Sequence, residues 1–265
     1  MVNAAVILIL ARRAGYPYLF HFRYHFNWKG GFVKQYFTKC FPIICNEVLI
    51  GIAMMIINVV LGRQSEEAIA AIAVFRTLEG FVIAFFAGFT NAASVLVGKS
   101  IGAGELKTAY ERAKRLVPMC AISVFFIAFL LVLLRSPILH AMSLSGESYR
   151  IGTYILMMYC PIATIRMCNW IQNDTFRSAG DATFGTLLEL GFAYAVLIPT
   201  VCLVGLRFHL PFLILFFCCY CDEPIRFCLM QMHLYSGKWI RPVTPQGQEA
   251  LPAFREWVKS RRAKT

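Results

Sequence analysis

The chain has 265 residues, of which 58% are hydrophobic and only 15% charged, and its mean hydropathy is +0.62. A soluble domain of this length cannot bury so many apolar side chains in its interior. The composition therefore excludes an ordinary soluble domain and requires that lipid cover part of the surface. The net charge is +12, with most Lys and Arg in loops between apolar runs. This pattern argues against a nucleic-acid partner and indicates anionic lipid headgroups instead.

Six apolar segments are long enough to cross a bilayer, because a spanning helix needs about 20 mostly apolar residues. They cover residues 40–62, 68–98, 116–134, 151–173, 182–206 and 208–232. We therefore predict an all-α integral membrane protein, a six-transmembrane-helix bundle. Residues 1–39 are interpreted as the end of a preceding helix followed by a basic cytoplasmic loop. Residues 40–233 form the transmembrane lobe, and 234–265 form a basic cytoplasmic tail that is helical over 252–262 and otherwise loose.

The start of the chain is a short apolar run at residues 4–11, which is too short to cross a membrane. A cleaved signal peptide is the competing interpretation, but Arg12 and Arg13 follow the run, whereas a signal peptide carries its positive charges first. We interpret the run as the end of a helix.

The loops differ in charge on the two sides of the predicted membrane. Nineteen Lys and Arg fall in residues 12–39, 99–115, 177 and 234–265, against four in the opposite loops, at Arg63, Arg135, Arg150 and Arg207. The positive-inside rule then places the first segment and the tail in the cytoplasm. The expected location is a cell membrane, with a bacterial inner membrane as the specific prediction.

The second segment is rich in small residues, which let helix backbones approach closely. They include Ala68, Ala70, Ala71, Ala73, Gly88, Asn91, Ala92, Ala93 and Gly98. We predict that this segment packs closely against neighbouring helices. The alternative is that its small residues let helix bundles slide or rock against each other during transport.

Ionisable residues inside a span cost roughly 2.5 to 3.5 kcal/mol each, so each requires a partner or a function. Arg76 and Glu79 are three residues apart, and Arg226 follows Asp222 by four and Glu223 by three. These spacings put opposite charges on one helix face. Structural pairing is therefore favoured, with a role in transport or gating as the alternative.

Glu47 has no such neighbour on its own helix. Asn46 precedes it, and Asn58 lies 11 residues further, near the same helix face. Pro42 invites a kink, and a carboxylate beside an amide is suited to a proton or a small cation. Glu47 is thus a candidate coupling site, and the alternative is a structural pair with Arg166 across the bundle.

The fourth segment carries a polar face formed by Arg166, Asn169 and Asn173 at spacings of three and four. A polar stripe in a span faces protein or a water-filled cavity, so this face is the best candidate for a cavity wall. Glu189, in the first half of the fifth segment, is less informative because it lies near enough to one end to contact water.

The ten cysteines lie mostly in apolar runs, without paired CxxC motifs or histidines at metal spacing, and are interpreted as small buried hydrophobes. The chain also lacks HExxH and GxSxG motifs, and the pair His21 and His25 sits in a basic aromatic loop. We therefore predict no metal, no cofactor and no enzyme activity.

Four motifs in register resemble the C-terminal half of multidrug and toxic compound extrusion (MATE) transporters. They are Pro42 to Glu47, Gly88 to Glu105, Arg177 to Phe184 with Asp181 at its turn, and Asp222-Glu223 with Ser236 to Trp239. The resemblance implies one of two six-helix lobes flanking a central cleft. It also implies export of organic cations in exchange for H⁺ or Na⁺.

The resemblance further implies that Glu47 corresponds to an acid of the family's seventh helix. Arg166 occupies a region where some members have a coupling aspartate. A lobe alone lacks one wall of the cleft, so the expected partner is a second lobe or a second copy. The alternatives are a truncated, transport-inactive membrane protein or interaction partner, and a flippase for lipid or oligosaccharide.

Overall fold

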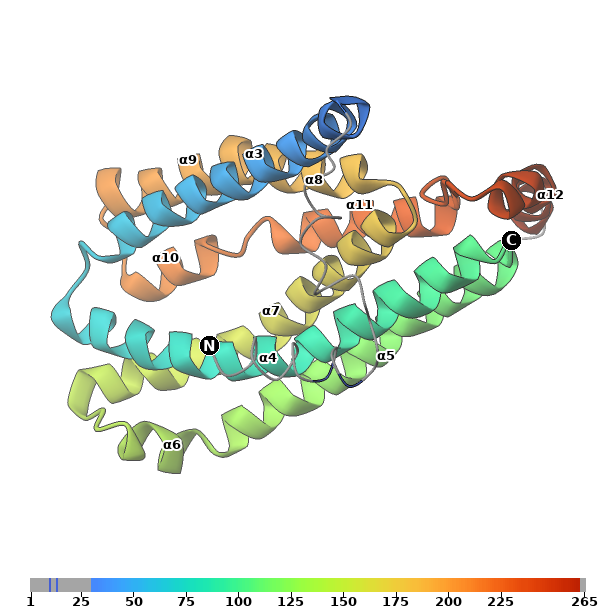
Figure 1. The fold of residues 1–265 in the computed structure, drawn as a ribbon. Helices are drawn as coiled ribbons and strands as arrows, with labels where there is room; N and C mark the ends of the chain where they lie inside the picture. The colour runs from blue at the N-terminus through green and yellow to red at the C-terminus, as the bar shows by residue number, and fades with distance from the viewer. Residues whose placement is uncertain (1–9, 11–12, 14–29, 263–265) are drawn as a thin grey trace. The chain divides into compact units, whose positions relative to one another are not determined.

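The structure is a computed structural model that describes residues 10, 13 and 30–262 (Figure 1). The expected helix end at residues 4–11 and the pair His21 and His25 lie almost entirely outside these residues. Within the described part the regular elements are helices and there is no strand, which confirms the all-α prediction. The chain divides into two compact units, Met1–Val48 and Leu49–Thr265.

The first five predicted segments are found as long helices. Among the described residues, the stretches long and apolar enough to cross a membrane are Ile44–Leu61, Glu66–Gly102, Leu106–Leu133, Gly146–Ser178 and Ala182–Arg207. They belong to α3 (Gly30–Leu61), α4 (Glu66–Gly102), α5 (Leu106–Leu133), α7 (Gly146–Ser178) and a continuous run of α8 (Ala182–Phe192), η2 (Ala193–Leu197), α9 (Ile198–Cys202) and η3 (Leu203–Arg207). A short helix, α6 (Arg135–Ala141), connects α5 to α7.

The sixth predicted segment differs from the expected continuous helix. It forms α10 (Phe212–Cys218) and α11 (Glu223–Ser236), separated by a turn at residues 219–222. Pro224 occupies the first turn of α11, where its missing N–H group leaves no hydrogen bond unmade. In the middle of one long helix the same proline would remove a backbone hydrogen bond. The break therefore lies immediately before it.

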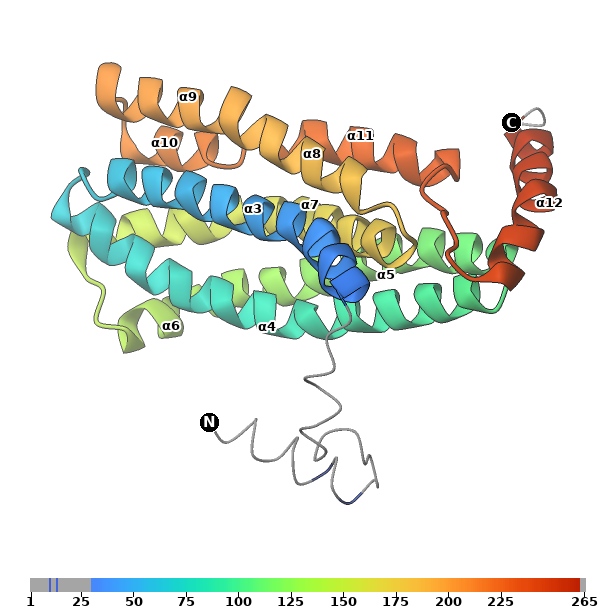
Figure 2. The same cartoon turned by 45° about the horizontal axis from the view of Figure 1, so that its top comes forward.

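Helix α7 is the centre of the Leu49–Thr265 unit and packs against α4, α5, α8 and α11 (Figures 1 and 2). On α4, Ala68, Ala71 and Ala93 are fully buried, as expected for small residues in a helix interface. Gly88 and Asn91 on the same helix are exposed. The small residues of α4 thus serve internal packing on one face only.

The turn between α7 and α8 is held against the C-terminal segment. Gly180 has φ +92°, and a Cβ atom there would lie 2.4 Å from the carbonyl oxygen of Arg241. The Arg241 amide donates a hydrogen bond to the carbonyl of Ala179 at 2.9 Å. Glycine is needed at this position both for its backbone conformation and for the close approach.

The tail is more ordered than the sequence indicates. Helix α12 (Pro245–Arg262) begins at residue 245 rather than 252. Its Phe254 and Trp257 rings contact Tyr110 of α5, with ring centroids 5.9 and 5.8 Å apart. The hydroxyl of Thr244 donates to the carbonyl of Gly102 at 3.1 Å. The amphipathic face of α12 is therefore packed against the turn between α4 and α5.

Candidate functional site in a buried charge network

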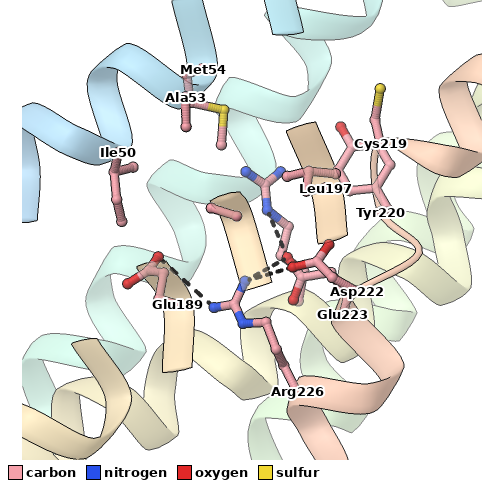
Figure 3. A pocket seen from close by; sticks show the side chains of 12 residues that line it. Ile50, Ala53, Met54, Glu189, Leu197, Cys219, Tyr220, Asp222, Glu223 and Arg226 are labelled. Atoms are coloured by element: carbon pink, nitrogen blue, oxygen red, sulfur yellow. Dashed lines mark hydrogen bonds and ion pairs between the residues drawn. The ribbon is translucent and has the colours of Figure 1, made fainter. Parts of the chain in front are cut away.

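A cavity of about 50 Å³ lies beside the turn between α10 and α11 (Figure 3). Its volume is enough for at least one water molecule. The lining residues come from α3, α7, the α8–η2 run, the turn and α11: Ile50, Ala53, Met54, Arg166, Glu189, Ala193, Leu197, Cys219, Tyr220, Asp222, Glu223 and Arg226. Apolar side chains thus enclose a group of opposite charges in the interior of a membrane bundle.

Arg166 on α7 connects three helices through its guanidinium group. Its Nη1 lies 2.5 Å from Oε1 of Glu79 on α4, and its Nε lies 3.7 Å from Oε1 of Glu223 on α11. The second carboxylate oxygen of Glu79 accepts a hydrogen bond from Arg76 at 2.8 Å. The Arg166 side chain is only 9% exposed. A charge buried to this extent needs such partners, because its desolvation costs several kcal/mol.

Arg226 on α11 is the second buried arginine. Its Nη1 lies 3.3 Å from Oδ2 of Asp222 and 3.7 Å from Oε1 of Glu223, and its Nη2 lies 3.9 Å from Oε1 of Glu189 (Figure 3). Glu223 therefore contacts both arginines. Through this shared carboxylate the α4, α7, α8 and α11 charges form one network.

The amide groups of α7 bind the carboxylates of this network. Asn169 Nδ2 donates to the backbone carbonyl of Glu223 at 3.0 Å and to its Oε2 at 2.7 Å. Asn173 Nδ2 donates to Oε2 of Glu189 at 3.3 Å. The buried oxygens of Asn169, Gln172 and Asn173 accept no hydrogen bond from the described residues. Buried acceptors of this kind usually have a water or an ion as partner.

Gly185 permits α8 to approach α7 at this site. A Cβ atom there would lie 2.0 Å from Oδ1 and 2.8 Å from Cγ of Asn173. A side chain at residue 185 would displace Asn173 from Glu189.

The network joins three basic and four acidic side chains. Among the described residues its ion pairs connect Arg76, Arg166 and Arg226 with Glu79, Glu189, Asp222 and Glu223.

Local spacing predicts only the pairs of Arg76 with Glu79 and of Arg226 with Asp222 or Glu223, whereas the predicted alternative partner of Arg166 was Glu47, and the structure pairs Arg166 with Glu79 and Glu223. The pairs Arg76–Glu79 and Asp222–Arg226 are both present. Arg166, predicted as part of a cavity wall, does line the cavity, and Asn169 and Asn173 bind its carboxylates. The roles of Glu189 and Gly185 were missed. Opposite charges near the middle of several separate spans were the signal that these groups converge.

Other candidate residues lie away from the network. Asn58 is exposed on α3, and Asn91 donates from its Nδ2 to the carbonyl of Ala87 on its own helix. Gly98 is close to α7, since a Cβ there would meet the Ser178 carbonyl oxygen at 3.7 Å. Gly88 is exposed.

The end of α7 and the following turn hold two more candidates. Arg177 is half-buried in the last turn of α7. Asp181 is fully buried, with Oδ2 3.0 Å from Nε2 of His233 and Oδ1 3.3 Å from Nη1 of Arg241. Asp181 thus connects the α7–α8 turn to α11 and the C-terminal segment.

The candidates in the unit Met1–Val48 lie on α3. Glu47 is exposed. Asn46 is buried, and neither polar atom of its side chain has a hydrogen-bond partner among the described residues. Position 42, expected to invite a kink, lies within α3, and its proline side chain is outside the described part. The assignment of Glu47 to ion coupling stays a prediction.

Residues 42–202 match the MatE family model. The chain belongs to the MATE family. This MATE chain is 18% identical over 200 residues to the "Uncharacterized transporter YisQ" of Bacillus subtilis (strain 168), which covers 76% of the chain and 44% of that protein. It also resembles the solved structure of the MATE transporter ClbM in complex with Rb⁺, with a TM-score of 0.65 and 16% identity, over 78% of the chain and 47% of ClbM.

The MATE chain spans about half the length of these relatives. This share corresponds to one lobe, and the resemblance to a MATE lobe is confirmed. The family consists of transporters and not of enzymes, and the apolar helices make this member a multi-pass membrane protein.

Proposed function

We propose that this chain is one lobe of a secondary active exporter of organic cations, driven by exchange with H⁺ or Na⁺. The observation that carries the proposal is the convergence of three carboxylates, Glu189, Asp222 and Glu223, on one small cavity inside the bundle. Ionised groups inside a membrane bundle are costly, so binding and release of a cation at these carboxylates changes the energy of the lobe.

The surroundings of the network support a monovalent cation. Carboxylate and amide oxygens are the ligands that hard cations prefer, and the cavity brings Glu189, Asp222 and Glu223 together. The acceptor oxygens of Asn169 and Asn173 lie on the same polar face of α7. The relative ClbM has been solved with Rb⁺, a monovalent cation.

The break between α10 and α11 also fits an ion site. Transporters commonly place coupling ions where a membrane helix is interrupted, because helix ends expose unpaired backbone groups. Here Asp222 and Glu223 begin α11, where the helix dipole favours negative charge. Protonation or cation binding at these carboxylates would alter their contacts with Arg226 and Arg166.

Transport by alternating access requires two bundles that rock against each other. We propose that the second bundle is another lobe, supplied by a separate chain, a longer form of this chain or a second copy. The basic loops and tail are proposed to face the cytoplasm, in a bacterial inner membrane. The organic-cation substrate follows from the family resemblance.

The test is transport in vesicles that contain the chain alone or together with a candidate first lobe. Efflux of a cationic dye is measured under an imposed pH gradient or Na⁺ gradient. We expect ion-dependent efflux when the first lobe is added, and efflux from the chain alone would identify a second copy as the other lobe. Absence of efflux in every combination would contradict the transport proposal.

The Glu189→Gln substitution tests the network itself, because the Glu189 side chain lines the cavity and is 19% exposed. We expect this variant to lose the ion dependence of dye efflux. The control is Glu147→Gln, which changes an exposed carboxylate paired with Arg150. Unchanged ion dependence in Glu189→Gln, combined with its loss in Glu47→Gln, would move the coupling site to Glu47.

A further inference from the structure

A second cavity, of about 410 Å³, lies where α11 ends and the chain turns toward α12. Lys238, Arg241, Arg255 and Lys259 line it, and none of the described residues that line it is acidic. Lys238, Arg255 and Lys259 are exposed, whereas Arg241 also pairs with the buried Asp181. At least three cations therefore surround a space whose lining offers them no counter-charge.

The floor of this cavity is apolar. Phe254 and Val258 of α12 and Ile240 of the preceding segment line it, and all three are nearly fully buried. Gly237, in the left-handed conformation with φ +66°, ends α11 and turns the chain over this floor. An apolar floor beneath a cationic rim is complementary to an amphiphile with a negatively charged head and a hydrocarbon body.

The place of the cavity in the fold favours a membrane lipid over a soluble anion. Helix α12 lies at the end of the bundle where α4 turns into α5 (Figures 1 and 2). The same end carries further basic residues of α4 and α5, namely Lys99, Lys107, Arg112, Lys114 and Arg115. The cavity is therefore at the border of the apolar spans, where lipid phosphates lie.

The contacts of α12 make the site preformed. Phe254 and Trp257 pack on Tyr110, and Trp239 is fully buried and donates from Nε1 to the carbonyl of Leu234 at 2.9 Å. The Tyr110 hydroxyl donates to the carbonyl of Tyr235 at 3.1 Å. A site held by such contacts binds a ligand with little ordering cost.

We propose that this cavity binds the phosphate of an anionic phospholipid headgroup. Lys238, Arg255 and Lys259 bind the phosphate oxygens, and the Phe254–Val258 floor contacts the first carbons of the lipid. Free inorganic phosphate offers the same anionic chemistry without the hydrocarbon body. The two sources are therefore separable by experiment.

The experiment titrates the purified full chain in detergent micelles with phosphatidylglycerol, with zwitterionic phosphatidylcholine or with inorganic phosphate. Bound lipid is counted by native mass spectrometry. We expect saturable binding of phosphatidylglycerol only. The combined variant Lys238→Gln, Arg255→Gln and Lys259→Gln should weaken it about a hundredfold, because each cation near an anionic headgroup contributes roughly a fivefold factor.

A matched control removes three charges from the same end of the bundle but outside the cavity, by Lys99→Gln, Arg112→Gln and Arg115→Gln. We expect this control to retain phosphatidylglycerol binding. Equal weakening in both triple variants would show general surface attraction and overturn the proposal.

A second control keeps the three charges but changes the same side chains, by Lys238→Arg, Arg255→Lys and Lys259→Arg. It shows whether substitution at these positions disturbs folding, and it should bind phosphatidylglycerol as the native chain does. Loss of binding in this variant, with retained helix content and a single micellar species, would contradict the proposed electrostatic recognition. Binding of inorganic phosphate as tight as that of phosphatidylglycerol, or equal binding of phosphatidylcholine, would also overturn the assignment to an anionic lipid.

Discussion

The charge network and the cavity between α11 and α12 differ in how their positive charges are neutralised. Arg166 and Arg226 are buried, and each contacts at least two carboxylates supplied by the bundle itself. Lys238 and Lys259 are exposed around a cavity whose described lining contains no acid. A buried cation must find its counter-charge within the fold, whereas a surface cation obtains it from water, salt or lipid. Substitutions in the network should therefore lower the stability of the fold as well as alter ion coupling, whereas substitutions around the cavity between α11 and α12 should weaken lipid binding alone.

The largest expected effect on stability comes from Arg166→Ala. This change leaves Glu79 and Glu223 buried without one of their partners, and breaking a buried pair costs about 3 to 5 kcal/mol. The free energy of unfolding is measured by denaturant titration in mixed micelles. The control is Arg150→Ala, because Arg150 pairs with Glu147 at the surface, where such pairs contribute only about 0 to 1 kcal/mol. Equal losses in the two variants would remove the distinction between the two kinds of cation.

Gly185→Ala tests the close approach of α7 and α8 beside the network. The added methyl group overlaps Asn173, so we expect a loss of about 1 to 3 kcal/mol and a weaker contact between Asn173 and Glu189. Gly191→Ala on the same helix is the control, since a Cβ there meets no atom within 4 Å. The same micellar titration separates the two, and a neutral Gly185→Ala would show that Asn173 has room to move.

Asn169→Leu removes the amide that donates to both the backbone and the side chain of Glu223. Loss of hydrogen bonds to a buried carboxylate is expected to cost about 1 to 3 kcal/mol. Asn91→Leu is the matched control, because Asn91 is exposed and donates only to its own helix. The thermal unfolding midpoint of both variants is measured. If Asn91→Leu lowers it as much as Asn169→Leu does, the hydrogen bonds to Glu223 do not stabilise the start of α11.

The smallest expected effect on stability is that of Lys259→Gln in lipid-free micelles. The side chain is exposed, and surface substitutions of this kind usually change stability by no more than about 0.5 kcal/mol. Its thermal midpoint should match that of the native chain until anionic lipid is added, when only the native chain gains the full stabilisation. A large loss without lipid would mean that Lys259 has an internal partner.

The sequence alone determined the helical class, the position of five spans, the turn between Arg177 and Phe184 and the close packing of Ala68 and Ala71. These features depend on properties read along the chain: apolar length, glycine conformation and side-chain size. The same is true of the short-range pairs Arg76–Glu79 and Asp222–Arg226, whose partners are one helical turn apart.

Only the tertiary structure decided that these pairs form one network. Arg166 and Glu79 are 87 residues apart in the sequence, and Asn169 and Glu223 are 54 apart. No local spacing predicts such contacts, because they depend on which faces of α4, α7, α8 and α11 meet. The break before Pro224 and the docking of α12 on Tyr110 likewise depend on neighbouring helices. The apolar composition thus specifies that the chain forms helices that require a lipid environment. The packing of those helices against one another determines which buried charges become partners.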